Sequence, residues 1–333
     1  MDSHNSTSAN SPIKLGKKLS IVGSLFIAVF FLSYLPVLSN LNESLVEFIS
    51  LIWWAILLGL FLGGFIEYFI PEQFIFKYLG QKRLRSVFYA VIAGLVMSAC
   101  SHGILAIAIQ LYKKGAGIPS VITFLLASPW ANLPVTILLF GFFGIHAIYF
   151  ILAAMFIALT TGFIFIFLEK AKLIEQSLEV DADDSAYEWT KVKYFNLKES
   201  IRGIFKGIVS LSNMVLWWIL IGILIGALIG AYIPTHIFHQ YLGPTFMGLL
   251  LTLLFATVIE VCSEGSSPIA FEIFNKVGVL GNPFVFLMAG VVTDYTEIGL
   301  IWSNIGKKTA IWLPIITVPQ VLTFGYLFNI LLI

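Results

Sequence analysis

Residues 100–138 read CSHGILAIAIQLYKKGAGIPSVITFLLASPWANLPVTIL, and residues 262–300 read CSEGSSPIAFEIFNKVGVLGNPFVFLMAGVVTDYTEIGL. The two stretches align without a gap and share ten identities in 39 positions. Upstream, a tryptophan pair at 53–54 corresponds to one at 217–218, and the triplet Tyr-Leu-Gly occurs at 78–80 and again at 241–243. Matched tryptophan pairs and glycines are not generic membrane sequence, so we predict an internal duplication.

The composition around these repeats is that of a membrane protein. Of the 333 residues, 59% are hydrophobic and 11% are charged, whereas soluble chains carry roughly a quarter charged residues. A bilayer needs about 20 apolar residues per helix. Nine apolar segments lie near 19–38, 46–70, 86–112, 118–143, 144–168, 207–233, 246–274, 283–303 and 309–332. We therefore expect an all-α polytopic membrane protein embedded in a lipid bilayer.

Charge and motif content exclude several other classes of protein. The 19 basic residues nearly balance the 18 acidic ones, which gives no reason to expect a nucleic-acid partner. The two cysteines cannot make a disulfide scaffold or a four-ligand zinc site. The chain has no phosphate-binding glycine loop and no nucleophile elbow. We expect no enzymatic activity, no cofactor and no resident metal.

The chain divides into four regions by composition. Residues 1–45 hold a polar N-terminus and an extra first helix, and residues 46–168 form the first membrane repeat. Residues 169–206 contain seven basic and eight acidic side chains without an apolar run, which predicts a solvated linker. Residues 207–333 form the second membrane repeat.

The positions of lysine and arginine distinguish two topologies, because basic residues are retained on the cytoplasmic side. If all nine segments cross, nine basic residues lie inside and ten lie outside. If 86–112 and 246–274 are re-entrant hairpins, eighteen lie inside and Lys276 alone lies outside. The second count favours seven crossings in the cell membrane, with the N-terminus and the linker in the cytoplasm. Nine plain spans remain the alternative.

Helix geometry agrees with the hairpin interpretation. The 14 residues from Ser86 to Ala99 would make a helix of about 21 Å, which is shorter than the roughly 30 Å hydrocarbon core. Each repeat then contributes three crossings, so the second copy enters the membrane inverted relative to the first. Inverted repeats with broken or re-entrant helices are typical of secondary transporters, whose binding sites lie near the midplane.

Polar residues interrupt the apolar segments at matched places. The hairpin tips read Cys100-Ser101-His102-Gly103 and Cys262-Ser263-Glu264-Gly265. The segments that follow are interrupted at residues 128–132, which contain Pro129, and at residues 293–297, which contain two acids. Proline cannot donate an intrahelical hydrogen bond, so we expect an unwound midpoint there. The simpler alternative is that the tips only pack and that Pro129 only kinks its helix.

Acidic residues in the membrane are concentrated in the second repeat, and such residues commonly mark ion or proton paths. We expect the groups that couple transport to an ion to be Glu260, Glu264, Asp294 and Glu297. Two further acids, Glu67 and Glu272, are interpreted as structural. The cysteines at the two tips could together bind a thiophilic species, or each could be a small buried side chain.

These motifs carry a family resemblance. The tip residues 100–103, the stretch Phe124 to Asn132, and the second-half residues 262–265 and 293–294 resemble the predicted-permease family that includes bacterial efflux permeases for trivalent organoarsenicals. The likeness covers most of residues 46–333. Family members often carry a second cysteine two residues after the first, and this chain has His102 there. The resemblance implies an integral membrane permease.

We expect a secondary transporter that exports a small molecule or ion, driven by a proton or cation gradient. The expected substrate-binding residues are Cys100, Ser101, His102, Asn132, Cys262, Ser263, Glu264 and Asp294. Alternatives are a membrane-embedded thiol redox enzyme, a divalent-cation permease, and a channel or accessory subunit. A homodimer is compatible with an inverted-repeat transporter.

Overall fold

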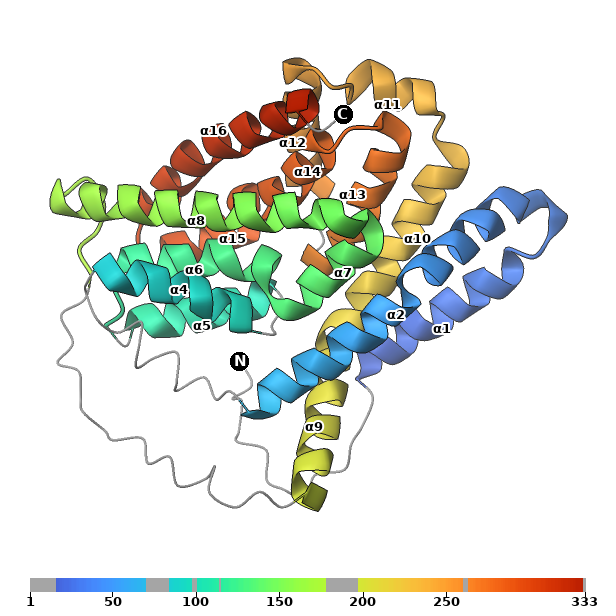
Figure 1. Ribbon diagram of the computed structural model, residues 1–333, viewed down its shortest axis with the longest axis horizontal. Coiled ribbons are helices and arrows are strands. Elements are labelled where there is room, and N and C mark those ends of the chain that lie inside the picture. Colours follow the sequence, from blue (N-terminus) through green and yellow to red (C-terminus); the bar gives the residue numbers. More distant parts are fainter. Residues whose placement is uncertain are drawn as a thin grey trace.

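The computed structural model describes residues 16–69, 84–97, 101–113, 115–177, 197–259 and 263–331. For residues 63, 66–69, 84, 101–103, 197–200 and 214 it describes the backbone alone. Within these residues all regular secondary structure is helical, which confirms the all-α prediction (Figure 1).

The first half of the chain begins with an arm of two helices and ends with a long helix. Its elements are α1 (Lys17–Leu32), η1 (Pro36–Leu38), α2 (Ser39–Phe69), α4 (Leu84–Val96), α5 (Ser101–Lys113), α6 (Ile118–Ala131), α7 (Leu133–Phe143), η2 (Gly144–His146) and α8 (Ala147–Lys170). Gly144 has a φ of 55°, and the chain changes direction there between α7 and α8 (Figure 1).

The second half follows a similar order. Its elements are α9 (Leu197–Leu211), a π-helical turn η4 (Ser212–Leu216), α10 (Trp217–Tyr232), α11 (Thr235–Tyr241), α12 (Phe246–Ile259), α13 (Ser263–Val277), α14 (Gly281–Thr293), α15 (Tyr295–Asn304) and α16 (Lys307–Leu331). By the alignment of residues 100–138 with 262–300, α5, α6 and α7 correspond to α13, α14 and α15, and by their place in the order α4 and α8 correspond to α12 and α16.

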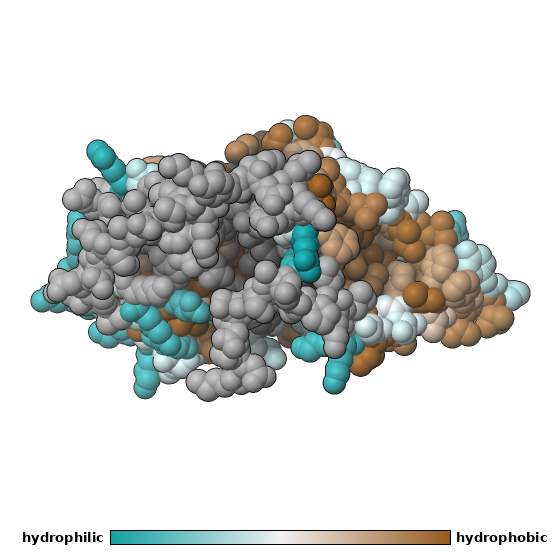
Figure 2. All heavy atoms as spheres, turned by 90° about the horizontal axis from the view of Figure 1, so that it is seen from below, coloured by the Kyte–Doolittle hydropathy of each residue, from teal (hydrophilic) through white to brown (hydrophobic). Residues whose placement is uncertain are grey.

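The helices are long and apolar enough for a multi-pass membrane protein. Within the described residues, four stretches qualify as spans by length and composition, and they are Pro36–Leu62, Leu133–Lys170, Gly281–Asn304 and Lys307–Leu331. A fifth candidate combines α10 and α11, which meet at an angle of 101°. Large apolar side chains are exposed along the projecting α1–α2 arm, where brown surface gathers in Figure 2. A soluble monomer seldom exposes so much apolar surface, whereas lipid covers it readily.

In the first half, α4 and α5 both pack on α6. At the start of α4 the Ser86 and Ser120 hydroxyls are 2.5 Å apart, and near its end Gly94 lies against Ser128, so α4 runs parallel to α6. The short connection after Lys113 brings the end of α5 to the start of α6. The beginning of α4 and the end of α5 therefore lie at the same end of α6.

The second half repeats this arrangement with α12 and α13 on α14. The Asn282 amide donates to the Thr252 hydroxyl at 3.0 Å at one end, and the Thr257 and Thr293 hydroxyls are 2.7 Å apart at the other. Since α13 leads into α14 through residues 278–280, the beginning of α12 and the end of α13 again lie together. Each of these arms has 13 to 15 residues, so it is about 20 Å long.

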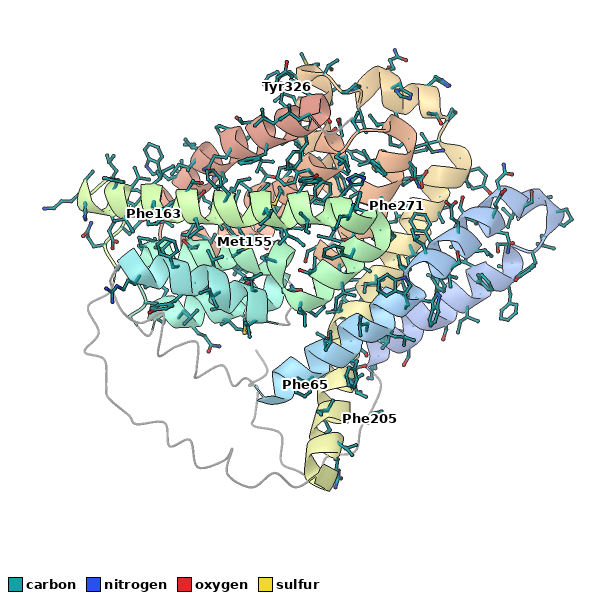
Figure 3. The ribbon with its side chains drawn as sticks, viewed as in Figure 1. Phe65, Met155, Phe163, Phe205, Phe271 and Tyr326 are labelled. Atoms are coloured by element: carbon teal, nitrogen blue, oxygen red, sulfur yellow. The ribbon has the colours of Figure 1, made fainter. Side chains whose placement is uncertain are left out.

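Some of the contacts between the halves come in matched pairs. Helix α13 packs on α7, and its counterpart α5 packs on α15. Helices that correspond to each other also touch, since α6 contacts α14 and α8 contacts α16. The ring centre of Phe271 on α13 lies 5.1 Å from that of Phe142 and 5.9 Å from that of Phe143, both on α7. These three rings form an aromatic seam between the halves, and Figure 3 labels Phe271.

Glycines bring α10 close to α13. Gly222, Gly226 and Gly230 recur every four residues and share one face of α10. A Cβ on Gly222 would lie 2.0 Å from the carbonyl oxygen of Gly265. Small residues permit this close approach between membrane helices, as in other small-xxx-small contacts. The start of α13, with Ser263 and Glu264, is thereby held against α10.

Candidate functional site

Two helices are broken at corresponding residues. Asn132 separates α6 from α7 and has φ −64° and ψ 153°, while Asp294 separates α14 from α15 and has φ −60° and ψ 126°. Both residues are extended between two helices. The predicted interruption is therefore confirmed in both halves.

The side chains of these two residues cap the helices that follow. Asn132 Oδ1 accepts a hydrogen bond of 2.9 Å from the amide of Val135. Asp294 Oδ1 accepts one of 3.1 Å from the amide of Thr296, whose hydroxyl also donates to Oδ2. Asn and Asp are favoured at such N-caps because they satisfy otherwise free amides.

The cause that we predicted for the first break was wrong. Pro129 lies within α6, which continues to Ala131. Pro134, the second residue of α7, has the position that suits proline at a helix start, and Asn132 provides the cap. The break thus depends on the Asn132 cap and Pro134 rather than on Pro129. The second half breaks at Asp294 without a proline.

Buried polar atoms without a hydrogen-bond partner cluster on the elements around the breaks. In the described part of the chain these atoms are Ser128 Oγ, Trp130 Nε1, Asn132 Nδ2, Ser266 Oγ and Glu297 Oε2. Each of these residues is at most 2% exposed. Leaving such a group unsatisfied costs roughly 1–3 kcal/mol.

Buried asparagine side chains elsewhere in the chain have hydrogen-bond partners, so the lack of partners is local. Asn329 Nδ2 donates to Asn282 Oδ1 at 2.9 Å, and Asn329 Oδ1 accepts from the amide of Gly281 at 2.8 Å. Asn282 Nδ2 donates to the carbonyl of Leu242 at 2.8 Å. The buried atoms without a partner are thus on α6, α13, α15 and Asn132, and not on Asn282 or Asn329.

Only part of the predicted site can be placed. Ser263 and Glu264 are buried at the start of α13, and the Ser263 hydroxyl donates to Glu264 Oε2 at 3.1 Å. Ser101 and His102 begin α5, and their side chains lie outside the described residues. Cys100, Glu260 and Cys262 also lie outside the described residues.

The two acids of α15 differ in their surroundings. Asp294 is half-buried and held by Thr296, whereas Glu297 is 2% exposed and makes no salt bridge among the described residues. An ionised carboxylate at Glu297 would be buried without a compensating cation, which is unfavourable.

Sequence reasoning placed Asn132 in the site but did not select Ser128, Trp130 or Ser266. The first two lie in the interrupted motif at residues 128–132, and Ser266 lies three residues after Ser263. Their polar atoms at membrane depth were the available signal.

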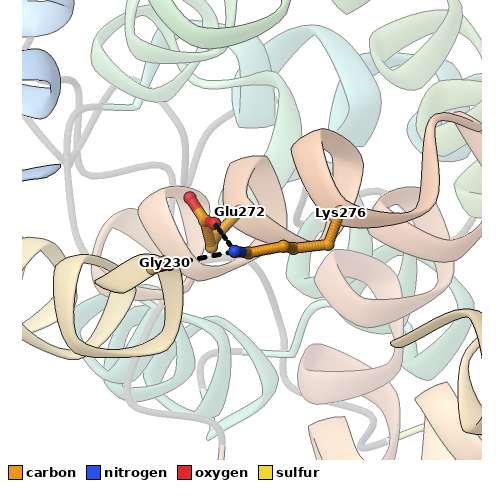
Figure 4. Close-up of polar contacts among 3 residues, drawn as sticks. All are labelled: Gly230, Glu272 and Lys276. Atoms are coloured by element: carbon orange, nitrogen blue, oxygen red, sulfur yellow. Dashed lines mark hydrogen bonds and ion pairs between the residues drawn. The ribbon is translucent and has the colours of Figure 1, made fainter. Parts of the chain in front are cut away.

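Glu272 lies in a separate ion pair with Lys276 (Figure 4). The Lys276 ammonium is 3.7 Å from Glu272 Oε1 and donates to the carbonyl of Gly230 at 2.9 Å. A lysine beside the last carbonyls of α10 also suits the helix dipole. This pair fits the structural role expected for Glu272. The side chain of Glu67 lies outside the described residues.

One surface cavity of the described chain lies apart from the two helix breaks. A cavity of about 340 Å³ lies at the end of the α1–α2 arm, where it is lined by residues including Ser33, Asn42 and Glu43. Its walls contain none of the broken-helix residues. Among the described residues, no group of three His, Cys, Asp or Glu side chains could hold a metal ion.

Residues 38–330 match the family described as predicted permease. The chain belongs to this permease family. A Streptococcus mutans protein, named as a candidate subunit of a two-component membrane permease complex, is 24% identical over 272 residues, which cover 79% of this chain and 86% of that protein. The permease family thus accounts for the apolar helices across most of the chain.

Two shorter similarities are to proteins named UPF0718. The UPF0718 protein YcgR of Bacillus subtilis is 32% identical over 77 residues, covering 23% of this permease and 26% of YcgR. A UPF0718 protein of Methanocaldococcus jannaschii is 35% identical over 80 residues, covering 23% of this permease and 22% of the relative. No solved structure matches this permease.

Proposed function

We propose that this permease is a secondary transporter that exports a small solute, coupled to a proton or cation gradient. The observation that carries the proposal is the pair of helix breaks at Asn132 and Asp294, surrounded by buried polar atoms without partners. Broken helices expose backbone dipoles and polar groups at one depth, as in transporters that bind substrate at the midplane.

The seven-crossing topology is supported by two contacts. The amide of Gly16 donates to Asn213 Oδ1 at 2.7 Å, so the start of α1 lies beside η4, between α9 and the membrane helix α10. Glu175, which follows α8, accepts from the amide of Lys308 at 2.9 Å. Nine plain spans would put the partners of each contact on opposite sides of the membrane.

The same evidence supports two hairpins and an inverted repeat. Both arms of residues 86–112 return to one end of α6, and both arms of residues 246–274 return to one end of α14. The exchange of equivalent contacts, α13 with α7 and α5 with α15, is what a two-fold axis between inverted halves would produce.

In the proposed mechanism, substrate binds between the hairpin tips and the broken helices. Direct ligands come from Asn132, Ser263, Glu264 and Asp294, and we include Cys100, Ser101, His102 and Cys262 from the tips. Protonation of Glu297, with Glu264, Asp294 and Glu260 as further candidates, would bias the two access states. Such a bias requires that the proton bind one state more tightly than the other.

Reconstitution in vesicles tests this function. Purified permease should export a trivalent organoarsenical or a divalent cation, assayed separately, with saturable kinetics that depend on an imposed pH gradient. Glu297→Gln should abolish the pH dependence, whereas Glu43→Gln, which changes an exposed acid on α2, should not. Flux that does not saturate and ignores Glu297 would instead indicate a channel.

A permease that works with a second subunit is the other candidate, favoured by the name of the Streptococcus mutans relative. In that case the purified chain alone would not transport, and activity would return when complexes extracted intact from native membranes are reconstituted. Transport by the chain alone would exclude this alternative.

A further inference from the structure

Helix α9 has an apolar face that the rest of the described chain leaves partly uncovered. One side of α9 packs on the end of α2, where a Cβ on Gly207 would lie 2.6 Å from the carbonyl oxygen of Gly64. Beside that contact, Ile201 is 60% exposed and Phe205 is 53% exposed. Figure 3 labels Phe205 on α9 and Phe65 in the last part of α2.

A row of basic residues adjoins this apolar face. Lys198, Arg202 and Lys206 recur every four residues, so they form one stripe along the helix. With 3.6 residues per turn, the stripe lies next to Phe205 and away from the α2 contact. Arg202 is exposed. An apolar face flanked by basic residues is typical of helices that lie at a membrane surface.

Neighbouring aromatic residues place α9 at the level of the lipid headgroups. Helix α9 leads through the π-helical turn into the apolar helix α10, which begins with Trp217 and Trp218, stacked at 3.9 Å. The Lys18 ammonium lies 5.1 Å from the centre of the Trp217 ring. Tryptophan and lysine gather where membrane meets water, so α9 starts on the aqueous side of that boundary.

We propose that α9 binds anionic phospholipid headgroups. Ile201 and Phe205 enter the boundary between headgroups and acyl chains, and Arg202 and Lys206 contact the phosphates. The competing occupant is the middle of the linker, because residues 178–196 have more acidic than basic side chains and include Asp181, Asp183 and Asp184. Lipid is favoured over the linker segment because α9 continues into the membrane helix α10, which keeps α9 next to the bilayer surface. The proposal does not depend on what the permease transports.

The test measures which lipid the purified full-length permease retains. Protein in mixed micelles of phosphatidylglycerol and phosphatidylcholine is analysed by native mass spectrometry. Wild type should retain phosphatidylglycerol preferentially, and high salt should weaken that preference. Each basic residue near an anionic surface contributes about a factor of five, so Arg202→Gln with Lys206→Gln should lower the preference by about 30-fold.

Two matched variants control for charge and folding. Lys307→Gln with Lys308→Gln removes the same charge from the exposed start of α16 and should leave the preference unchanged. Arg202→Lys with Lys206→Arg should restore it. Equal preference in wild type and in the Arg202/Lys206 glutamine variant would overturn the proposal. A preference that emerges only after Asp181, Asp183 and Asp184 are changed to Asn would show instead that the linker occupies the stripe.

Discussion

Glu297 and Asn132 each leave a polar atom in the interior without a partner, although Asn282 and Asn329 on nearby helices satisfy each other. A buried polar atom without a partner is destabilising, so its retention at the two breaks needs a compensating use. Binding of solute or a proton supplies one. The consequence is that conservative changes at these residues should affect transport more than folding.

Glu297→Gln should fold normally and lose coupling. The amide keeps the size of a protonated carboxyl but cannot exchange a proton. We expect thermal unfolding in detergent to be nearly unchanged, while pH-driven flux falls to background and exchange without a gradient persists. A vesicle assay with an internal pH dye measures this. Preserved proton movement in Glu297→Gln would remove Glu297 from the coupling role.

Asn132→Ala should destabilise the protein by about 1 kcal/mol, the typical effect of losing an N-cap. The variant removes the acceptor for the Val135 amide at the start of α7. Asn132→Ser keeps a capping oxygen and should recover most of that stability without restoring substrate affinity. Reversible unfolding in mixed micelles compares the two. Equal stability of the alanine and serine variants would contradict a capping role.

At the scale of elements, α2 and α10 occupy corresponding positions in the two halves but pack on helices that do not correspond. Helix α2 packs on α7, where Gly59 lies against Pro134, whereas α10 packs on α13 through Gly222. The sequence places glycines on both helices, so neither partner could be predicted from glycine alone. Partner choice depends on the side chains of the opposing helix, which a single-helix pattern does not contain.

Gly222→Ala should separate α10 from α13. The added methyl would lie 2.0 Å from the Gly265 carbonyl oxygen, and backbone cannot move aside cheaply. Overpacking of this kind costs about 1–3 kcal/mol. Gly23→Ala is the matched control, because nothing lies within 4 Å of its new methyl. The thermal unfolding temperature should fall for Gly222→Ala but not for Gly23→Ala. An equal fall in both variants would refute the close contact.

Glu175 should make stability depend on pH. Burial alone would raise the pKa of the Glu175 carboxyl, but hydrogen bonds from the amide of Lys308 and from the hydroxyl and amide of Thr309 lower it, and the net pKa lies below its ordinary value. A lowered pKa stabilises the fold above the unfolded carboxyl value of about 4.3 and loses that effect as pH falls through the folded value.

Glu175→Gln should therefore lower stability by roughly 1 kcal/mol at neutral pH, as other N-terminal cap changes do. The difference from wild type should shrink as the pH falls below about 4, where the wild-type carboxyl is protonated as well. Unfolding temperatures measured across this range check the prediction. A constant difference at every pH would show that the carboxylate charge does not matter.

At the scale of the whole molecule, the sequence was most informative about repetition. The alignment of residues 100–138 with 262–300 put Asn132 opposite Asp294, and both are helix breaks. Polar atoms such as Trp130 Nε1 escaped selection because their isolation depends on neighbours from other helices. Local signals thus predicted where the two helices are interrupted. The environment of each side chain could be known only from the assembled bundle.

A reporter inserted between Asp181 and Ser185 tests the proposed topology. Seven crossings put this linker in the cytoplasm, and nine crossings put it outside. With a reporter that is active only in the cytoplasm, we expect activity, and loss of activity would place the linker outside. As a control, reporters fused at the N-terminus should give the same side in either case. An external linker would overturn the hairpins and the inverted repeat together.

The Glu175 contact also has a consequence for biogenesis. Glu175 leaves the ribosome well before Lys308 and Thr309. The backbone amides of these two residues donate hydrogen bonds to its carboxylate. Helix α7 likewise waits for α13, because their aromatic seam needs Phe271. The first half therefore stays incompletely packed in the membrane while the second is synthesised, and assembly is completed only when α16 arrives.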